Sequence, residues 1–140
     1  MDKLKFRVYN KKLKNYWKDS LIVINSDGEL YAKDLYGCLI KICYNVYEIE
    51  QCTGLKDKNG KFIYEGDIVE FYSYSVVSAL TGELMKRRVG IVVWNDELLK
   101  FDITVNGNPI PDLCKKIDDN QFVIIGNIHE NKDLLEANND

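Results

Sequence analysis

Three acidic side chains lie within eleven residues of one another in the middle of the sequence and are candidates for a carboxylate site: Asp57, Glu65 and Asp67. Paired carboxylates can carry out general acid–base catalysis or bind a divalent cation, but they must converge, and catalysis usually needs a shifted pKa. The alternative is structural, because glycines and asparagine surround these acids and turns use the same residue types. We favour the structural interpretation and predict no metal site, no cofactor and no catalytic residue.

The same segment is rich in turn residues. In Asp57-Lys58-Asn59-Gly60 the aspartate can accept a backbone N–H two residues on, and Asn-Gly tolerates left-handed backbone conformations. A second reversal is expected at Glu65-Gly66-Asp67, directly before an alternating strand. The structural turn motif therefore comprises Gly54, Asp57, Asn59, Gly60, Gly66 and Asp67.

The four cysteines are candidates for zinc ligands or for covalent catalysis. They include no Cys-x-x-Cys pair, and residues 39–50 read as one strand, which places Cys43 on the opposite face from Cys38 and Cys52. We predict that these three and Cys114 are reduced and act as small buried hydrophobic side chains.

The single histidine, His129, could serve as a general base only beside a nucleophile. No serine lies in a Gly-x-Ser-x-Gly pattern, and no phosphate-binding glycine loop occurs. We therefore expect His129 to be a surface or edge-strand residue, and we predict that the chain is not an enzyme.

The first twenty residues are basic, with seven lysines and arginines against two aspartates, a balance of +5. Aromatic residues interleave with these charges and could stack on single-stranded bases, while a second basic cluster at 86–88 could contact phosphates. The alternative, which we favour, is a solvated strand face with the aromatic rings in the core. The candidate nucleic-acid residues are Lys11, Lys12, Lys14, Trp17, Lys86, Arg87 and Arg88.

The other end of the chain is acidic, since residues 112–140 carry seven acids against three lysines. Ends of opposite sign on one small chain could steer subunits together, because complementary potentials set orientation and association rate. This asymmetry suggests a homo-oligomer.

The pattern of apolar residues predicts a mainly β protein. Asp27-Gly28 between apolar runs predicts a hairpin, residues 73–88 read as a long loop, and the tail from Asn131 to Ala137 can form a helical turn. We expect an N-terminal β region (1–50) and a C-terminal small SH3-like barrel or curled antiparallel sheet (51–140) with a short helical tail, with one continuous domain as the alternative. Strands are expected at 5–9, 20–24, 30–32, 39–49, 68–72, 89–94, 101–105 and 122–128.

The composition fits this class. The chain has 140 residues, 46% of them hydrophobic, and a net charge of -3, so it can bury a core and has no global attraction to nucleic acid or acidic membranes. No apolar run is long enough to cross a membrane and the first residues are charged, which predicts a cytoplasmic protein.

Four segments carry a family resemblance: KFRVYN near the start, TGLKDKNGKFIYEGDIVEF in the middle, then VGIVVW and VIIGNIHEN. Together they resemble the YopX family of phage and prophage proteins. The resemblance implies a mainly β fold, an uncharacterised function, a plausible multimer and no catalytic residues to carry over. The chain departs from the family pattern at Cys52, His129 and Lys132.

We therefore expect a phage- or prophage-encoded, non-enzymatic binding or self-assembly module that forms a homo-oligomer or binds a phage or host protein. The alternative is a nucleic-acid-binding protein that uses the basic, aromatic N-terminal segment.

Overall fold

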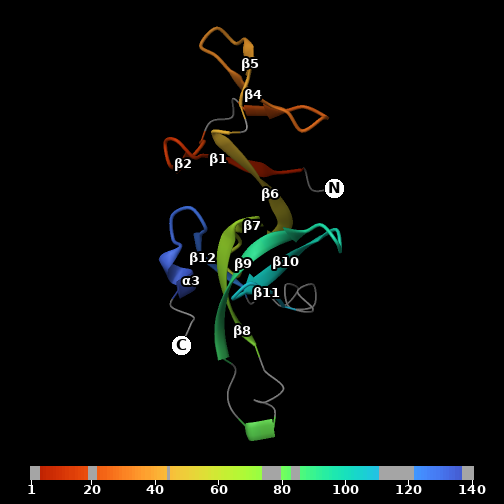
Figure 1. Ribbon diagram of the computed structural model, residues 1–140, viewed down its shortest axis with the longest axis vertical. Helices are drawn as coiled ribbons and strands as arrows, with labels where there is room; N and C mark the ends of the chain where they lie inside the picture. The colour runs from red at the N-terminus through yellow and green to blue at the C-terminus, as the bar shows by residue number, and fades with distance from the viewer. Residues whose placement is uncertain are drawn as a thin grey trace. The chain divides into compact units, whose positions relative to one another are not determined.

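The structure is a computed structural model that describes residues 4–18, 22–43, 45–73, 80–82, 86–110 and 122–136. The chain forms two compact units (Figure 1). The N-terminal unit is Phe6–Glu50, and the C-terminal unit combines Met1–Lys5 with Gln51–Asp140.

The N-terminal unit packs short strands around a small apolar core. The buried centre is formed by Val8, Leu30 and Ile42, and Trp17 and Tyr47 pack against it. β1 lies between β2 and the first part of β6, and a separate sheet has the order β3-β4-β5. The strands are β1 (Phe6–Asn10), β2 (Asn15–Tyr16), β3 (Ile22–Ile24), β4 (Leu30–Lys33), β5 (Leu39–Lys41) and β6 (Tyr47–Lys56).

The hairpin predicted at Asp27-Gly28 is confirmed. Ile24 is paired with Leu30 across the turn, and Gly28 has a φ of 82°, which is the left-handed conformation that glycine adopts without a steric penalty. Asn25 organises the turn, because its Oδ1 atom accepts the backbone N–H groups of Asp27 and Glu29.

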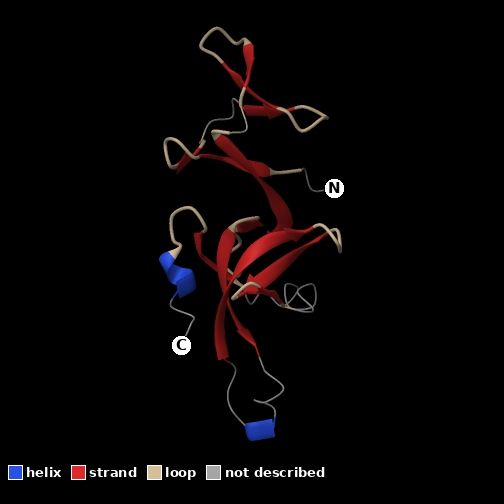
Figure 2. Cartoon of the chain, in the orientation of Figure 1, coloured by secondary structure: helices blue, strands red, loops and turns tan. Residues whose placement is uncertain are grey.

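The C-terminal unit is a five-stranded antiparallel sheet with the order β11-β10-β9-β8-β12, and the end of β6 pairs with β7 (Figure 2). Its core includes Phe71 and Phe122, whose ring centres lie 5.2 Å apart, with Val69, Val92 and Ile103. The elements are β7 (Phe62–Tyr64), β8 (Asp67–Ser73), β9 (Lys86–Asn95), β10 (Lys100–Val105), β11 (Asn108–Pro109), β12 (Val123–Asn127) and α3 (Asp133–Glu136).

The expected fold class is therefore confirmed: the chain is mainly β, its larger sheet is curled and antiparallel, and a short helix follows the last strand (Figure 1). Among the described residues, no helix has the length and apolar character needed to cross a membrane.

The single strand predicted over residues 39–49 is wrong. The chain leaves β5 after Lys41 and turns, with the Val46 N–H donating to the Cys43 carbonyl, before β6 begins. The face assignment of the cysteines fails with it. Cys38 and Cys43 are exposed and only Cys52 is buried, while Cys114 lies outside the described residues.

The loop predicted over residues 73–88 is shorter in the structure, because β8 and β9 extend into both of its ends. Ser73 belongs to β8 and pairs with Lys86 of β9, and Tyr72 pairs with Arg87. The basic cluster therefore lies on a strand. Residues 74–79 and 83–85, which the loop prediction included, lie outside the described residues.

Candidate binding surface of the N-terminal unit

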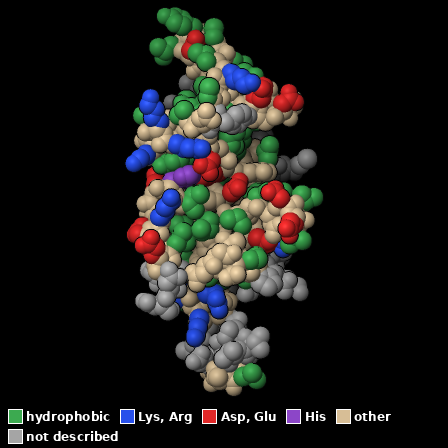
Figure 3. Space-filling model, in the orientation of Figure 1, with side chains coloured by type: hydrophobic (Ala, Val, Ile, Leu, Met, Phe, Trp, Pro, Cys, Tyr) green, Lys and Arg blue, Asp and Glu red, His purple; other side chains and the backbone are tan. Residues whose placement is uncertain are grey.

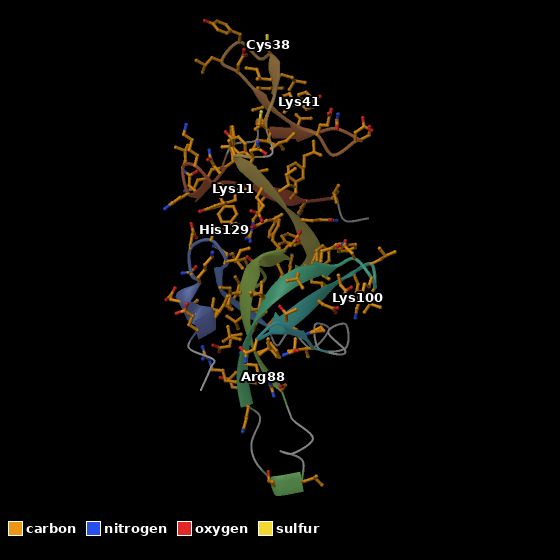
Figure 4. The ribbon with its side chains drawn as sticks, in the orientation of Figure 1. Lys11, Cys38, Lys41, Arg88, Lys100 and His129 are labelled. Atoms are coloured by element: carbon orange, nitrogen blue, oxygen red, sulfur yellow. The ribbon has the colours of Figure 1, made fainter. Side chains whose placement is uncertain are left out.

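The turn between β1 and β2 presents lysines to solvent. Asn10 at the end of β1 is buried, and its Oδ1 atom accepts the backbone N–H groups of Lys12 and Leu13 at 3.0 and 2.9 Å. This arrangement is typical of asparagine in tight turns. It leaves Lys11, Lys12 and Lys14 exposed at fixed positions of the backbone; Figure 4 labels Lys11.

A hollow of about 450 Å³ lies beside this turn, within the same unit. Three aromatic side chains line it, and we call it the aromatic hollow. The rings of Trp17 and Tyr47 are tilted by 43° with centres 5.3 Å apart, so they form a continuous aromatic wall. The lining residues are Asn10, Leu13, Asn15, Tyr16, Trp17, Lys18 and Tyr47.

Buried polar contacts fix Tyr16, the third ring. Its hydroxyl donates to Glu50 Oε2 at 3.1 Å, and the same carboxylate oxygen lies 2.5 Å from Arg7 Nε. The Arg7 guanidinium also stands 4.6 Å from the centre of the Tyr16 ring, and Tyr9 meets that ring edge-on. Because the arginine and the glutamate neutralise each other, the charge at the hollow is set by its lysines.

Those lysines carry an excess of positive charge. Lys11 lies 3.9 Å from Glu48, and both side chains are nearly half exposed, so solvent screens this pair strongly. None of the ion pairs formed by the described residues includes Lys12, Lys14 or Lys18. The turn and the rim of the hollow can therefore attract an anion.

Aromatic rings beside lysines that form no ion pair with the described residues suit a negatively charged polymer with planar bases, which is a nucleic acid. Bases stack on aromatic rings at about 1–3 kcal/mol each, and lysines contact phosphates without regard to sequence. Asn15, which is exposed and lines the hollow, adds hydrogen-bonding groups that could meet base edges.

The structure brings together only part of the predicted nucleic-acid set. Trp17 lines the aromatic hollow, and Lys11, Lys12 and Lys14 lie in the β1–β2 turn beside it. Lys86, Arg87 and Arg88 instead lie on β9 of the C-terminal unit; Figure 4 labels Arg88. On β9, Arg87 Nε lies 2.6 Å from Glu70 Oε2, and the Nε atom of Arg88 is buried.

Tyr47 and Leu13 belong to the hollow but were absent from the predicted set. The sequence does not predict Leu13 as a binding residue, because an apolar side chain between lysines gives no binding signal of its own. Tyr47 lies thirty residues beyond Trp17, and it reaches the hollow only because β6 pairs beside β1. A local charge pattern cannot show such long-range pairing.

The residues of the turn motif lie in the C-terminal unit. The carboxylates of its two aspartates accept hydrogen bonds from backbone N–H groups. Asp57 Oδ1 accepts the N–H groups of Asn59 and Lys61, both at 2.9 Å, and Asp67 Oδ2 accepts the N–H of Tyr64 at 2.8 Å. Both aspartates are buried, at 3% and 1% exposed. The motif's glycines, Gly54, Gly60 and Gly66, all have φ near 80°.

His129 lies in the turn after β12 and is half-buried. Its backbone N–H donates to Asn127 Oδ1 at 3.0 Å, and the same oxygen accepts the N–H of Glu130. Asn127 therefore organises this turn, much as Asn25 organises the β3–β4 turn.

No curated protein matches this chain. Among solved structures, protein EF1440 from Enterococcus faecalis is similar, with 24% identity and a TM-score of 0.58, over 95% of this chain and 98% of that one, a likeness of fold. The family described as YopX protein matches residues 5–136, which is nearly the whole sequence. The chain therefore belongs to the YopX family.

Proposed function

We propose that this chain is a phage- or prophage-encoded, non-enzymatic binding module of the bacterial cytoplasm, and that its N-terminal unit binds single-stranded nucleic acid. The observation that carries the proposal is the aromatic hollow with Lys12, Lys14 and Lys18 at its side. The two exposed free thiols, Cys38 and Cys43, suit a reducing compartment.

The hollow has the size and the support that a binding site needs. Its volume of about 450 Å³ falls within the range of small-molecule pockets, roughly 300–1,000 Å³. Contacts with Glu50 and Tyr9 hold Tyr16 in place, so that ring loses little freedom when a base stacks on it.

The test is fluorescence anisotropy with labelled single- and double-stranded oligonucleotides at low and near-physiological salt. The wild-type chain should bind the single strand, with an affinity that falls steeply as salt rises. In the double variant Lys12→Gln/Lys14→Gln the slope of log affinity against log salt should fall by about 2, because each lysine that contacts a phosphate contributes about 1.

The matched control is Lys58→Gln/Lys61→Gln, which removes the same charge from two exposed lysines in the β6–β7 turn. This control should bind like the wild type. Equal losses in both double variants, tighter binding to the duplex, or flat traces at micromolar protein would each overturn the proposal.

Self-association is a second candidate function, favoured by a different observation. The β4–β5 hairpin leaves large apolar side chains in solvent: Leu35 and Tyr36 are 101% and 91% exposed, and Leu39 and Ile40 are each 55% exposed (Figure 3). Apolar groups gathered in this way usually mark an interface. We assign it to a second copy of the chain, with a phage or host protein as the competing occupant. Sedimentation over a wide concentration range should show a dimer.

A further inference from the structure

β5 is the open edge of the three-stranded sheet in the N-terminal unit. Within the part of the chain that the structure describes, the order β3-β4-β5 leaves one side of β5 without a neighbouring strand, and all three residues of β5 are exposed. Open edges carry hydrogen-bonding groups that can pair with another chain, and proteins usually block them with proline, charge or a bulge. On β5 only Lys41 could do so, and its ammonium is paired with Glu29.

The hydrogen-bond pattern shows which groups of β5 face outward. The Ile42 N–H donates to the Leu30 carbonyl, and the Cys38 carbonyl accepts the Asp34 N–H. Alternate residues of an antiparallel strand direct their backbone groups to opposite sides. Because the backbone groups of Cys38 and Ile42 point toward β4, the backbone N–H and C=O groups of Leu39 and Lys41 point toward the open edge.

An apolar row crosses the same sheet and ends at that edge. Ile22 pairs with Ala32, and Ala32 pairs with Ile40, so the three side chains lie side by side on one face. Ile22 and Ala32 pack against the core of the unit, whereas Ile40 remains 55% exposed. The row therefore reaches the edge with its last member uncovered.

We propose that two copies of the chain pair through β5 in an antiparallel, two-fold arrangement centred on Ile40. This inference rests on the proposed self-association and names its interface. Leu39 of each copy then forms a hydrogen-bonded pair with Lys41 of the other. The two Ile40 side chains meet at the two-fold axis in the closer, non-hydrogen-bonded position. The apolar row continues without a break from one copy into the next.

Charge and register favour this pairing over the neighbouring ones. Centring on Lys41 would place two ammonium groups directly opposite each other, which is destabilising. Centring on Leu39 would oppose Lys41 to Gly37, whose φ of 82° takes it out of the extended strand. In the Ile40-centred register no like charges face each other, and Glu29 already balances each Lys41.

The available surface matches what a dimer needs. Antiparallel pairing lays the β4–β5 turn of each copy, with Leu35 and Tyr36, beside the segment that follows β5 in the other. Complete burial of the four exposed apolar side chains in both copies would remove on the order of 1,200 Å² of accessible surface from solvent. This is the lower bound of the area buried in stable protein–protein interfaces.

Cross-linking tests the register. In a background where Cys38, Cys43 and Cys114 are replaced by serine, Ile40→Cys places two thiols at the axis. The Cα atoms there would be about 4.5 Å apart, within the range of a disulfide. Mild oxidation should yield a covalent dimer. The matched control, Leu98→Cys in the same background, presents a comparably exposed thiol in the β9–β10 turn of the C-terminal unit and should cross-link at least tenfold more slowly.

A charge variant tests the same contact without oxidation. Ile40→Lys should raise the dimer dissociation constant at least tenfold, whereas Leu98→Lys adds the same charge at an exposed position outside the proposed contact and should raise it no more than about threefold. A wild-type chain that dimerises while Ile40→Cys cross-links no faster than Leu98→Cys, or while Ile40→Lys dimerises normally, would overturn this interface alone. A wild-type chain that stays monomeric at every concentration would overturn self-association and the interface together.

Discussion

The side chain of Asp57 is hydrogen-bonded to the backbone of Ile124, sixty-seven residues further along the chain: Oδ2 accepts the Ile124 N–H at 3.2 Å. Its other oxygen holds the β6–β7 turn, and the neighbouring Lys58 N–H donates to the Phe122 carbonyl at 2.8 Å. One buried carboxylate thus connects a local turn to the last strand of the C-terminal sheet.

Asp57→Ala should therefore lower the free energy of unfolding by at least about 3 kcal/mol, since one hydrogen bond to a charged group contributes about 1.5–3 kcal/mol and three backbone donors lose their acceptor. Urea unfolding followed by circular dichroism measures this change. Asp96→Ala, at an exposed position in the β9–β10 turn, is the control and should change stability by less than about 0.5 kcal/mol. Equal effects of the two substitutions would contradict this role for Asp57.

The Arg7–Glu50 pair should matter far more than the Lys11–Glu48 pair nearby. Glu50 is 1% exposed and the Arg7 side chain 21% exposed, so Glu50→Gln removes the charge from a largely buried ion pair and should cost about 1.5–3 kcal/mol. Glu48→Gln breaks a screened surface pair and should cost at most about 1 kcal/mol. Chemical denaturation of the two variants side by side checks the difference, and a reversed order would show that the buried pair does not stabilise the unit.

Stability at acid pH should depend on Glu29. Hydrogen bonds from Lys41, the Tyr31 hydroxyl and the Asn25 amide lower the pKa of Glu29 from 4.5 to about 2. A lowered pKa means that the folded state favours the ionised form, so this stabilisation is present above pH 4.5 and is lost as pH falls toward 2. Carboxyl NMR titration should find the pKa of Glu29 near 2.

Lys41→Met should move the pKa of Glu29 back toward 4.5, because its strongest hydrogen-bond donor is lost. Lys33→Met, at an exposed lysine on the adjacent strand, is the matched control and should leave that pKa in place. The assignment of the shift to Lys41 fails if both substitutions move the titration equally.

Gly90 should tolerate no side chain. A Cβ atom there would lie 2.4 Å from Ile103 Cγ2 and 2.9 Å from the Thr104 carbonyl oxygen, on the adjacent strand β10. Gly90→Ala should therefore destabilise the C-terminal unit by about 1–3 kcal/mol, the usual cost of overpacking. Thermal unfolding measures the change, and an unaltered midpoint would mean that β9 and β10 can separate at this point without cost.

Elements with local signals could be predicted from the sequence. The Asp27-Gly28 hairpin and the helical turn after Asn131 are confirmed because their residues act on neighbours a few positions away. The break between β5 and β6 was missed, since residues 42–46 contain no glycine or proline and their apolar character matches a continuous strand.

Features that depend on distant partners could not be predicted in the same way. Lys86 and Arg87 look like loop residues by composition, but Ser73 and Tyr72 pair with them and extend β9. Cys38 and Cys43 are expected to be buried, but both are exposed in the structure. Which face of a short strand is covered depends on segments that are distant in the sequence. Tyr47 enters the aromatic hollow for the same reason, through the pairing of β6 with β1.

The position of β12 beside β8 also sets an order of events during synthesis. The strands β1 to β5 and the first four residues of β6 are encoded before residue 51, so the N-terminal unit can assemble early. The roughly 50 residues between β8 and β12 take about 3–10 s to translate at 5–20 residues per second. Throughout that interval β8 has an open edge, and open edges promote aggregation. The nascent chain is therefore most in need of a chaperone before its last strand leaves the ribosome.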